Sequence, residues 1–499
     1  MIKISNIFFF LITSFIAFGQ SIDEPFSPMD MKKDLEVFKE IRRKANSGLY
    51  KYRTKQQIDS LYNWADNEVR NLTSLLDFYN LIVTLSDFEG SSHNETSLPT
   101  NNWQKEKQGY FPYPLKWIDG KWIVNYKNDE IPLGAEITEI NNMPMSEVIA
   151  SISKYWSTDG LNTSGKRIGI NTYFSNFYRY NYGLKDFFEI TFIAPNSNSV
   201  ETVKIESVGF IDYYLKYKKR HSYSFDRLMY EGKKENEKYA YKQINQQTGL
   251  LTINSFGMGN EKSEEHLIYK KWLNDIFIDI RNDNIKNLII DIRNNGGGDD
   301  PNDVLTYSYL TNRKFRESKK VWISFDKIPL LKYYDSSFPK ILRPLGYNFV
   351  LNRYYKKRFP NEKEGKFYIS KKSNEMKIRQ PNENAFNGKV YLLISPRVTS
   401  AASLFGAMVA GNEGTISIGE ETSGGYYGHN GHTSFGYVLP NSKIVTEFFI
   451  DNIEQDVPEK SNQFHNRGII PDHEVTQSFE DFLSNEDTQM NFVLKLLKE

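Results

Sequence analysis

The sequence predicts an α/β fold, α+β overall, in which a mainly parallel sheet follows a helical segment and a β-rich segment. From about residue 240, apolar runs at 286–293 and 388–394 alternate with helical patterns such as 263–283. Apolar strands that alternate with helices are typical of a parallel sheet covered by helices. Earlier in the chain, helical periodicity over 26–90 gives way to hairpin patterns, so those parts are expected to form other layers.

The first nineteen residues predict a secretory signal peptide. Lys3 precedes an apolar run from Ile7 to Phe18, and small residues surround the expected cleavage before Gln20. The run is short for a membrane span, and no later segment is long and apolar enough. We therefore expect an exported bacterial protein, periplasmic or extracellular, without an integral membrane segment after signal cleavage.

Composition excludes several functional classes. The chain contains no cysteine, which excludes disulfides, cysteine catalysis and thiolate metal sites. A net charge of +1 over 499 residues gives no electrostatic reason to expect nucleic acid as a partner. The length suits roughly three domains.

Residues 20–107 are expected to form a helical subdomain. Apolar residues recur at spacings of three and four over 29–45 and 54–88. Thr54, followed three residues later by Gln57, matches a capping box at the start of the second run.

Residues 108–208 are expected to be β-rich with one helix. The segment 116–129 alternates around an Asp-Gly turn, and 188–208 has the same hairpin pattern around a polar turn. Between them, 131–152 predicts a turn, a strand, a second turn and a helix.

A glycine-rich turn follows the apolar run at 286–293. Gly296, Gly297 and Gly298 leave backbone N–H groups uncovered, and such amides can hold a developing oxyanion. A phosphate loop is excluded because no Gly-Lys-Ser/Thr follows. The aspartates after the turn fit helix capping better than metal binding.

Ser400 lies where the run "KVYLLI" ends in a turn and the small-residue helix "AASLFGAMVA" begins. Taken alone, it fits a plain N-cap serine. Paired with the glycine turn, it becomes a candidate nucleophile, because a nucleophile and oxyanion donors must lie together.

The combination of motifs resembles a known superfamily. A strand ending in "DIRNNGGG", then "TSAAS" opening a helix, then "GEETSGG", is similar to the tail-specific or C-terminal-processing serine peptidases. That group includes the tricorn-type core proteases and the repeats of interphotoreceptor retinoid-binding protein. "PLGAEITEINNMP" resembles part of a PDZ-like domain, and "NRGIIPDHEV" resembles the closing element of the superfamily.

The resemblance runs from about residue 80 to 495 and implies an architecture. It implies a PDZ-like domain over 108–208 and a ClpP/crotonase-like peptidase core over 209–499, interrupted by an insert at about 312–387. Residues matched to the superfamily give Ser400 as nucleophile, with oxyanion amides at Gly296 or Gly297 and at Ala401. No cofactor is implied.

The general base must differ from that of the tail-specific branch, because Gly425 occupies the position where that branch has its lysine. Histidine is the natural replacement, since its pKa lies near neutral. The tricorn-like branch takes its histidine from a Ser-His pair upstream of the PDZ-like part, and Ser92-His93 matches that position. His429 and His432 are the alternative bases, and their loop is otherwise expected to bind substrate.

An orienting acid is expected near the closing element. The tricorn-like branch has a glutamate there, but the simplest match gives His465. Glu454 and Asp456 are the substitutes, with Glu454 preferred.

The resulting prediction is an exported serine endopeptidase that acts on peptide or protein substrates through an acyl-enzyme on Ser400, with His93 as general base. The alternative is a catalytically inactive protein on the same fold that binds a peptide or an apolar ligand, which the missing lysine suggests.

Overall fold

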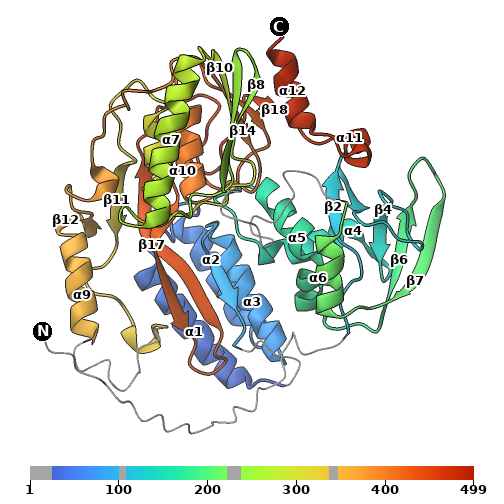
Figure 1. Ribbon diagram of the computed structural model, residues 1–499. Helices are drawn as coiled ribbons and strands as arrows, with labels where there is room; N and C mark the ends of the chain where they lie inside the picture. Colours follow the sequence, from blue (N-terminus) through green and yellow to red (C-terminus); the bar gives the residue numbers. More distant parts are fainter. Residues whose placement is uncertain (1–24, 100–107, 222–237, 300, 336–346, 499) are drawn as a thin grey trace, which may run out of the picture.

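The structure is a computed structural model that describes residues 25–99, 108–221, 238–299, 301–335 and 347–498. The expected signal peptide at 1–19 lies outside these residues. Three six-stranded sheets, with helices packed around them, make up the described chain (Figure 1). None of the helices in these ranges has the length and hydropathy needed to cross a membrane.

The first sheet confirms the predicted α/β core. Its order is β18-β15-β14-β10-β9-β8, and all neighbours are parallel except β8 and β9. The strands are β8 (Tyr239–Asn245), β9 (Thr248–Ile253), β10 (Asn287–Asp291), β14 (Lys389–Ile394), β15 (Ile416–Gly419) and β18 (His473–Glu474).

Helices of this core are α7 (Glu264–Asn282), α8 (Asn302–Ser308), α10 (Ala401–Ala410) and α12 (Thr488–Leu496). Helix α11 (Phe479–Ser484) packs instead against Ile118 and Ile123 of the second sheet. Every residue of α10 is buried, in agreement with a sequence that is apolar on all sides except at Ser403. Because β10 and β14 are adjacent and parallel, the turns that follow them lie at the same edge of the sheet.

The second sheet lies within the segment 108–208, which the resemblance suggested would be PDZ-like, and has the order β2-β3-β4-β6-β7, with β5 beside β4. Both predicted hairpins are confirmed; at the first, Asp119 and Gly120 have φ of 48° and 82°, as a tight Asp-Gly turn requires. The elements are β2 (Leu115–Ile118), β3 (Lys121–Val124), β4 (Glu136–Ile140), β5 (Met143–Pro144), α4 (Met145–Ile152), α5 (Ser164–Tyr182), β6 (Phe187–Ile193), β7 (Val200–Glu206) and α6 (Phe210–Lys218).

The third sheet joins distant segments in the order β1-β17-β11-β13-β12, with β16 beside β17. Its strands are β1 (Glu95–Ser97), β11 (Ser318–Ile323), β12 (Asn361–Lys363), β13 (Lys366–Tyr368), β16 (Asn430–Val438) and β17 (Val445–Gln455). The insert expected at 312–387 therefore supplies three of these strands, together with α9 (Tyr347–Arg358).

The N-terminal helices pack against this third sheet (Figure 1). They are α1 (Pro28–Ala45), α2 (Lys55–Glu68) and α3 (Leu75–Phe88); short 3-10 turns lie at Ser153–Tyr155, Leu331–Tyr333 and Asn374–Met376. The capping box of Thr54 and Gln57 is confirmed. The single run expected over 54–88 is two helices, because Ser74 and Asp77 form a second capping box that starts α3. Helices and sheet share one hydrophobic core.

Candidate active site

Ser400 occupies the turn between β14 and α10 in a strained conformation. Its φ of 54° and ψ of −135° lie in a region that a residue with a Cβ rarely adopts. Although it is the N-cap residue of α10, its side chain makes no capping hydrogen bond within the described chain. Strain of this kind costs about 1–3 kcal/mol and persists where the surrounding structure enforces it. The plain N-cap interpretation is therefore not supported, and the hydroxyl is not used to cap the helix.

The glycine turn after β10 lies directly against Ser400. A Cβ on Gly297 would come within 2.7 Å of the Ser400 Cβ and 3.3 Å of the Ala401 nitrogen. Gly297 also has φ of 112°, so glycine is required here on two grounds. The predicted meeting of the two turns is thus present in the structure.

The amides near Ser400 differ in how they are engaged. The Gly297 N–H donates to Asn295 Oδ1 at 2.9 Å, so this expected oxyanion donor already has an acceptor. The N–H groups of Ala401 and Gly298 have no acceptor in the part of the chain that the structure describes. Gly296 lines the large cavity next to this turn. Of the expected donors, the Ala401 N–H is therefore the one that is both next to Ser400 and without an acceptor among the described residues, as an oxyanion donor requires.

The Ser92-His93 segment reaches the nucleophile turn from the other side. The hydroxyls of Thr399 and Ser92 lie 3.4 Å apart, and Ser92 Oγ lies 3.3 Å from His93 Nδ1. The His93 ring also forms a hydrogen bond with the Asn430 backbone. Within the described residues, no hydrogen bond joins His93 to the Ser400 hydroxyl, so the candidate base and the candidate nucleophile lie on neighbouring segments without direct contact through a hydrogen bond.

The His93 ring is packed between apolar and imidazole rings. Its centroid lies 4.4 Å from that of Phe449 and 5.1 Å from that of His429. Burial lowers the pKa of His93 to about 4, the nearby His432 lowers it further, and the Asn430 backbone opposes the shift. His93 is therefore neutral near pH 7, which is the state that a general base requires.

His429 and His432 lie behind His93, not in the cavity where substrate contact was expected. His429 is 1% exposed and stacks on the His93 ring, and burial lowers its pKa well below the usual value. His432 Nε2 lies 3.4 Å from Glu317 Oε1, a buried carboxylate that sequence reasoning did not find. Their placement fits support of the His93 ring better than contact with a substrate.

Glu454 is not placed to orient His93. Its carboxylate pairs with Lys319 and Lys320 at 3.1 and 2.8 Å on the surface, and among the described residues it makes no hydrogen bond or ion pair with a histidine. Asp456 pairs with Arg316 at 2.9 Å. Both carboxylates are therefore engaged in surface ion pairs.

Asp159, which sequence reasoning missed, holds the base segment in place. Its two carboxylate oxygens accept the N–H of Ser92 at 2.9 Å and the N–H of Gly425 at 3.0 Å. The next residue, Gly160, donates its N–H to the Gly90 carbonyl at 2.8 Å. Asp159 is completely buried. One carboxylate thus ties the loop of the proposed base to the loop after β15.

Further hydrogen bonds extend this connection over residues 159–162, a segment that we call the clasp. The Asp159 N–H donates to the Ser423 carbonyl at 3.1 Å, and the Leu161 N–H donates to the Asn466 carbonyl at 2.8 Å. Asn162 Nδ2 donates to the Thr422 carbonyl at 2.5 Å. Because "STDGLN" reads as an ordinary turn in the sequence, nothing local distinguishes it.

The clasp predicts a particular dependence of stability on pH. Burial raises the pKa of Asp159 to about 6 from 3.8, although hydrogen bonds from Ser92 and Gly425 oppose the shift. A folded-state pKa above the unfolded one stabilises the protein below pH 3.8, and this contribution is lost as the pH rises through 6. We expect the free energy of unfolding to lose about 3 kcal/mol over this window through Asp159 alone.

Chemical denaturation of the wild type and of Asp159→Asn between pH 4 and 7 measures this contribution. In Asp159→Asn, the free energy of unfolding should not show this fall between pH 4 and 7. In Asp129→Asn, which changes an exposed residue, the fall should be the same as in the wild type. Equal slopes for wild type and Asp159→Asn would contradict the expectation.

The Tyr52 hydroxyl lies beside Gly425, the position that the superfamily's lysine would occupy. The hydroxyl oxygen lies 3.6 Å from where a Cβ on Gly425 would be, and it donates to the Gly428 carbonyl at 3.3 Å. The neighbouring Lys51 donates to Asn452 Oδ1 at 2.9 Å and to the Ile453 carbonyl at 2.7 Å. Burial lowers the pKa of Lys51 to about 8. The space beside Gly425 is therefore bordered by the Tyr52 hydroxyl and by the backbone carbonyls of Gly428 and Arg467.

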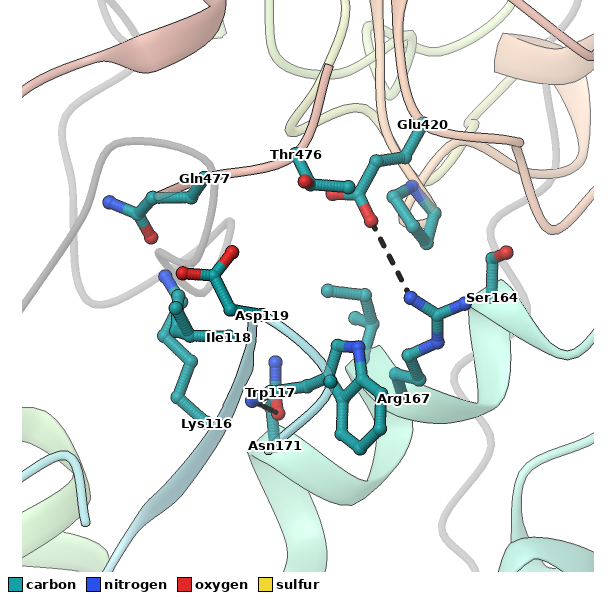
Figure 2. A pocket seen from close by; sticks show the side chains of 13 residues that line it. Lys116, Trp117, Ile118, Asp119, Ser164, Arg167, Asn171, Glu420, Thr476 and Gln477 are labelled. Atoms are coloured by element: carbon teal, nitrogen blue, oxygen red, sulfur yellow. Dashed lines mark hydrogen bonds and ion pairs between the residues drawn. The ribbon is translucent and has the colours of Figure 1, made fainter. Parts of the chain in front are cut away.

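A cavity of about 780 Å³ opens beside the two turns. Ser92, His93, Gly296 and Thr399 line one end of it, and α3 and α5 line the other. A second cavity, of about 90 Å³, lies between β2, α5 and the C-terminal segment, where Arg167 approaches Glu420 at 3.9 Å (Figure 2). Only the larger cavity has the size of a substrate site and touches the proposed catalytic groups.

Comparisons with known proteins agree with this geometry. Residues 247–475 match the model of Peptidase family S41. The crystal structure of mature CPAF aligns with a TM-score of 0.59 at 15% identity over 94% of this chain and 96% of that chain. Mature CPAF complexed with lactacystin gives 0.60 at 15% identity, over 94% and 97%. The tricorn protease gives only 0.37 at 17% identity, over 94% and 36%, which supports no argument. The comparison with curated proteins finds no match.

At these identities, the likeness to CPAF shows the fold. The family match contains both the glycine turn and Ser400, the two features that the structure places in contact. The chain therefore carries a serine-peptidase domain of family S41 across residues 247–475.

Proposed function

We propose that this protein is an exported endopeptidase that cleaves peptide bonds through an acyl-enzyme on Ser400, with His93 as general base. The observation that carries the proposal is the convergence at Ser400 of the Gly297 turn and the Ser92-His93 segment. Strand β10, strand β14 and the loop after α3 supply these parts, so the site exists only in the folded chain.

The mechanism follows from the positions of these groups. The Ser400 hydroxyl attacks the peptide carbonyl while its proton passes to the His93 ring. The N–H groups of Ala401 and of the glycine turn stabilise the tetrahedral oxyanion. His93 then donates the proton to the leaving amine, and water hydrolyses the acyl-enzyme with His93 again as base. Since catalytic hydrogen bonds tighten in substrate complexes, the proposal requires the Ser400 hydroxyl to reach His93 once a peptide is bound.

Two observations favour a second candidate, a non-catalytic protein that binds a peptide or an apolar ligand. Ser400 and His93 share no hydrogen bond in the described structure, and the cavity beside them is large and rich in aromatic residues. A fold of this kind does not guarantee catalysis.

Labelling with a fluorophosphonate serine probe separates the two candidates. We expect the wild type to be labelled, Ser400→Ala to lose labelling completely, and His93→Ala to be labelled at least about a hundredfold more slowly. His473→Ala, which changes an exposed histidine on β18, is the matched control and should behave as wild type. Labelling of Ser400→Ala at the wild-type rate would exclude Ser400 as the nucleophile. A wild type that is neither labelled nor hydrolyses casein would favour the binding protein.

A further inference from the structure

The large cavity carries information about the substrate of the proposed peptidase. Aromatic side chains from several elements and connecting segments line its wall. They include Tyr79 on α3, Tyr155 and Trp156 before α5, Tyr173 and Phe177 on α5, and Phe449 on β17.

These rings form a continuous surface. Tyr155 stacks on Phe177 with centroids 5.5 Å apart, and Trp156 stacks on Tyr173 at 5.7 Å. Tyr173 lies 5.8 Å from Phe177 and so links the two stacks. Aromatic surfaces of this kind favour apolar and aromatic groups packed against their faces and edges.

The polar ends of two tyrosines are engaged away from solvent. The Tyr79 hydroxyl donates to the Thr96 carbonyl at 3.1 Å, and the Tyr155 hydroxyl donates to Asn80 Oδ1. Because these hydroxyls already have partners, the rings offer apolar surface to an occupant of the cavity.

The formal charges of the residues that line the cavity favour neither an anionic nor a cationic occupant. Two acidic residues, Glu95 and Glu447, lie opposite each other on β1 and β17, and two basic residues, Lys154 and Arg397, also line the cavity. Their charges cancel, so the aromatic wall is the main source of preference.

The cavity reaches the proposed base and the turn that carries Ser400. Phe449 lines the cavity, and its ring centroid is 4.4 Å from that of His93. Thr399 and Gly296, next to Ser400 and Gly297, line the same cavity. A peptide with its scissile carbonyl at Ser400 would therefore place a neighbouring side chain against the rings.

We infer that this cavity is a specificity subsite for a large aromatic side chain of the peptide, close to the scissile bond. The inference rests on the proposed peptidase function and names the class of substrate for that site. A volume of about 780 Å³ holds more than one side chain, so adjacent residues of the peptide also enter.

Quenched peptides that differ at one position test the subsite. With Phe, Gly or Glu scanned through each position around the scissile bond, we expect kcat/KM for Phe to exceed that for Gly by at least about tenfold at one position. Tyr173→Ala, which removes a 40% exposed ring from the wall, should reduce this ratio toward one. Tyr354→Ala on α9, at a 55% exposed ring outside the cavity, should keep the wild-type ratio. Ratios within about twofold at every position in the wild type would overturn the inference while leaving peptide hydrolysis intact.

Calorimetric titration of the same peptides into Ser400→Ala gives a readout independent of turnover. The subsite is supported if the Phe peptide binds more tightly than the Gly peptide and if Tyr173→Ala weakens this preference. This holds even if the wild type hydrolyses neither peptide, in which case only the proposed function fails. Equal binding of the two peptides, with tight binding of a free aromatic compound such as naphthalene sulfonate, would assign the cavity to a small apolar ligand and overturn the peptide assignment.

Discussion

Replacing Ser400 by alanine is expected to lower kcat for peptide hydrolysis by roughly 10⁴-fold or more, because in the proposed mechanism this hydroxyl forms the acyl-enzyme. The change removes one oxygen atom from a side chain that makes no capping hydrogen bond in the described structure. The fold and thermal unfolding temperature should therefore stay close to those of the wild type. Initial rates with a quenched peptide, together with circular dichroism, measure both quantities.

Ser199→Ala is a suitable control, since Ser199 lies exposed in the hairpin between β6 and β7. Its activity should equal that of the wild type. Ser400→Ala with more than about a tenth of the wild-type activity would show that Ser400 is not the nucleophile.

Gly297→Ala is expected to abolish activity by a different route. The added Cβ would lie 2.7 Å from the Ser400 Cβ, a distance that real Cβ atoms essentially never show, so the two turns must separate. Displaced oxyanion donors alone cost roughly 10²–10³ in kcat. The positive φ of 112° adds backbone strain, and together these effects should also lower stability by about 1–2 kcal/mol or more.

Gly414→Ala separates the effect of backbone strain from the effect of a steric clash with Ser400. Gly414 also has a positive φ, 77°, but a Cβ there would meet nothing within 4 Å. This variant should lose about 1–2 kcal/mol of unfolding free energy and keep its kcat, whereas Gly297→Ala loses both. Equal kcat in the two variants, measured on folded protein, would mean that the glycine turn plays no part in catalysis.

Local sequence signals predicted the nucleophile side of the site. A few adjacent residues identify each of two motifs: three consecutive glycines after an apolar strand, and a serine before a small-residue helix. Because the two strands that precede them are adjacent and parallel, the motifs lie together at one edge of the sheet. The Asp119-Gly120 hairpin and the Thr54 capping box were predictable for the same reason, since a few adjacent residues fix each of them.

The base side could not be predicted from local signals. His93 follows α3 in a polar turn, and only the resemblance to other peptidases identified it. Asp159 acts through two backbone amides that lie 67 and 266 residues away, and sequence spacing carries no trace of such contacts. Helix α5 was missed because its Ser, Gly and Asn residues are poor helix formers, and packing on the second sheet overrides their propensity.

The contact between Ser92 and Thr399 spans 307 residues of chain, which has a consequence for the timing of synthesis. At about 5–20 residues per second, a ribosome needs roughly 15–60 s to travel from one residue to the other. During that interval the base segment has emerged but the nucleophile has not been made. Strand β17, which pairs with β1 beside His93, comes later still. If the proposed mechanism holds, a nascent chain cannot assemble this site until nearly its last tenth has been translated.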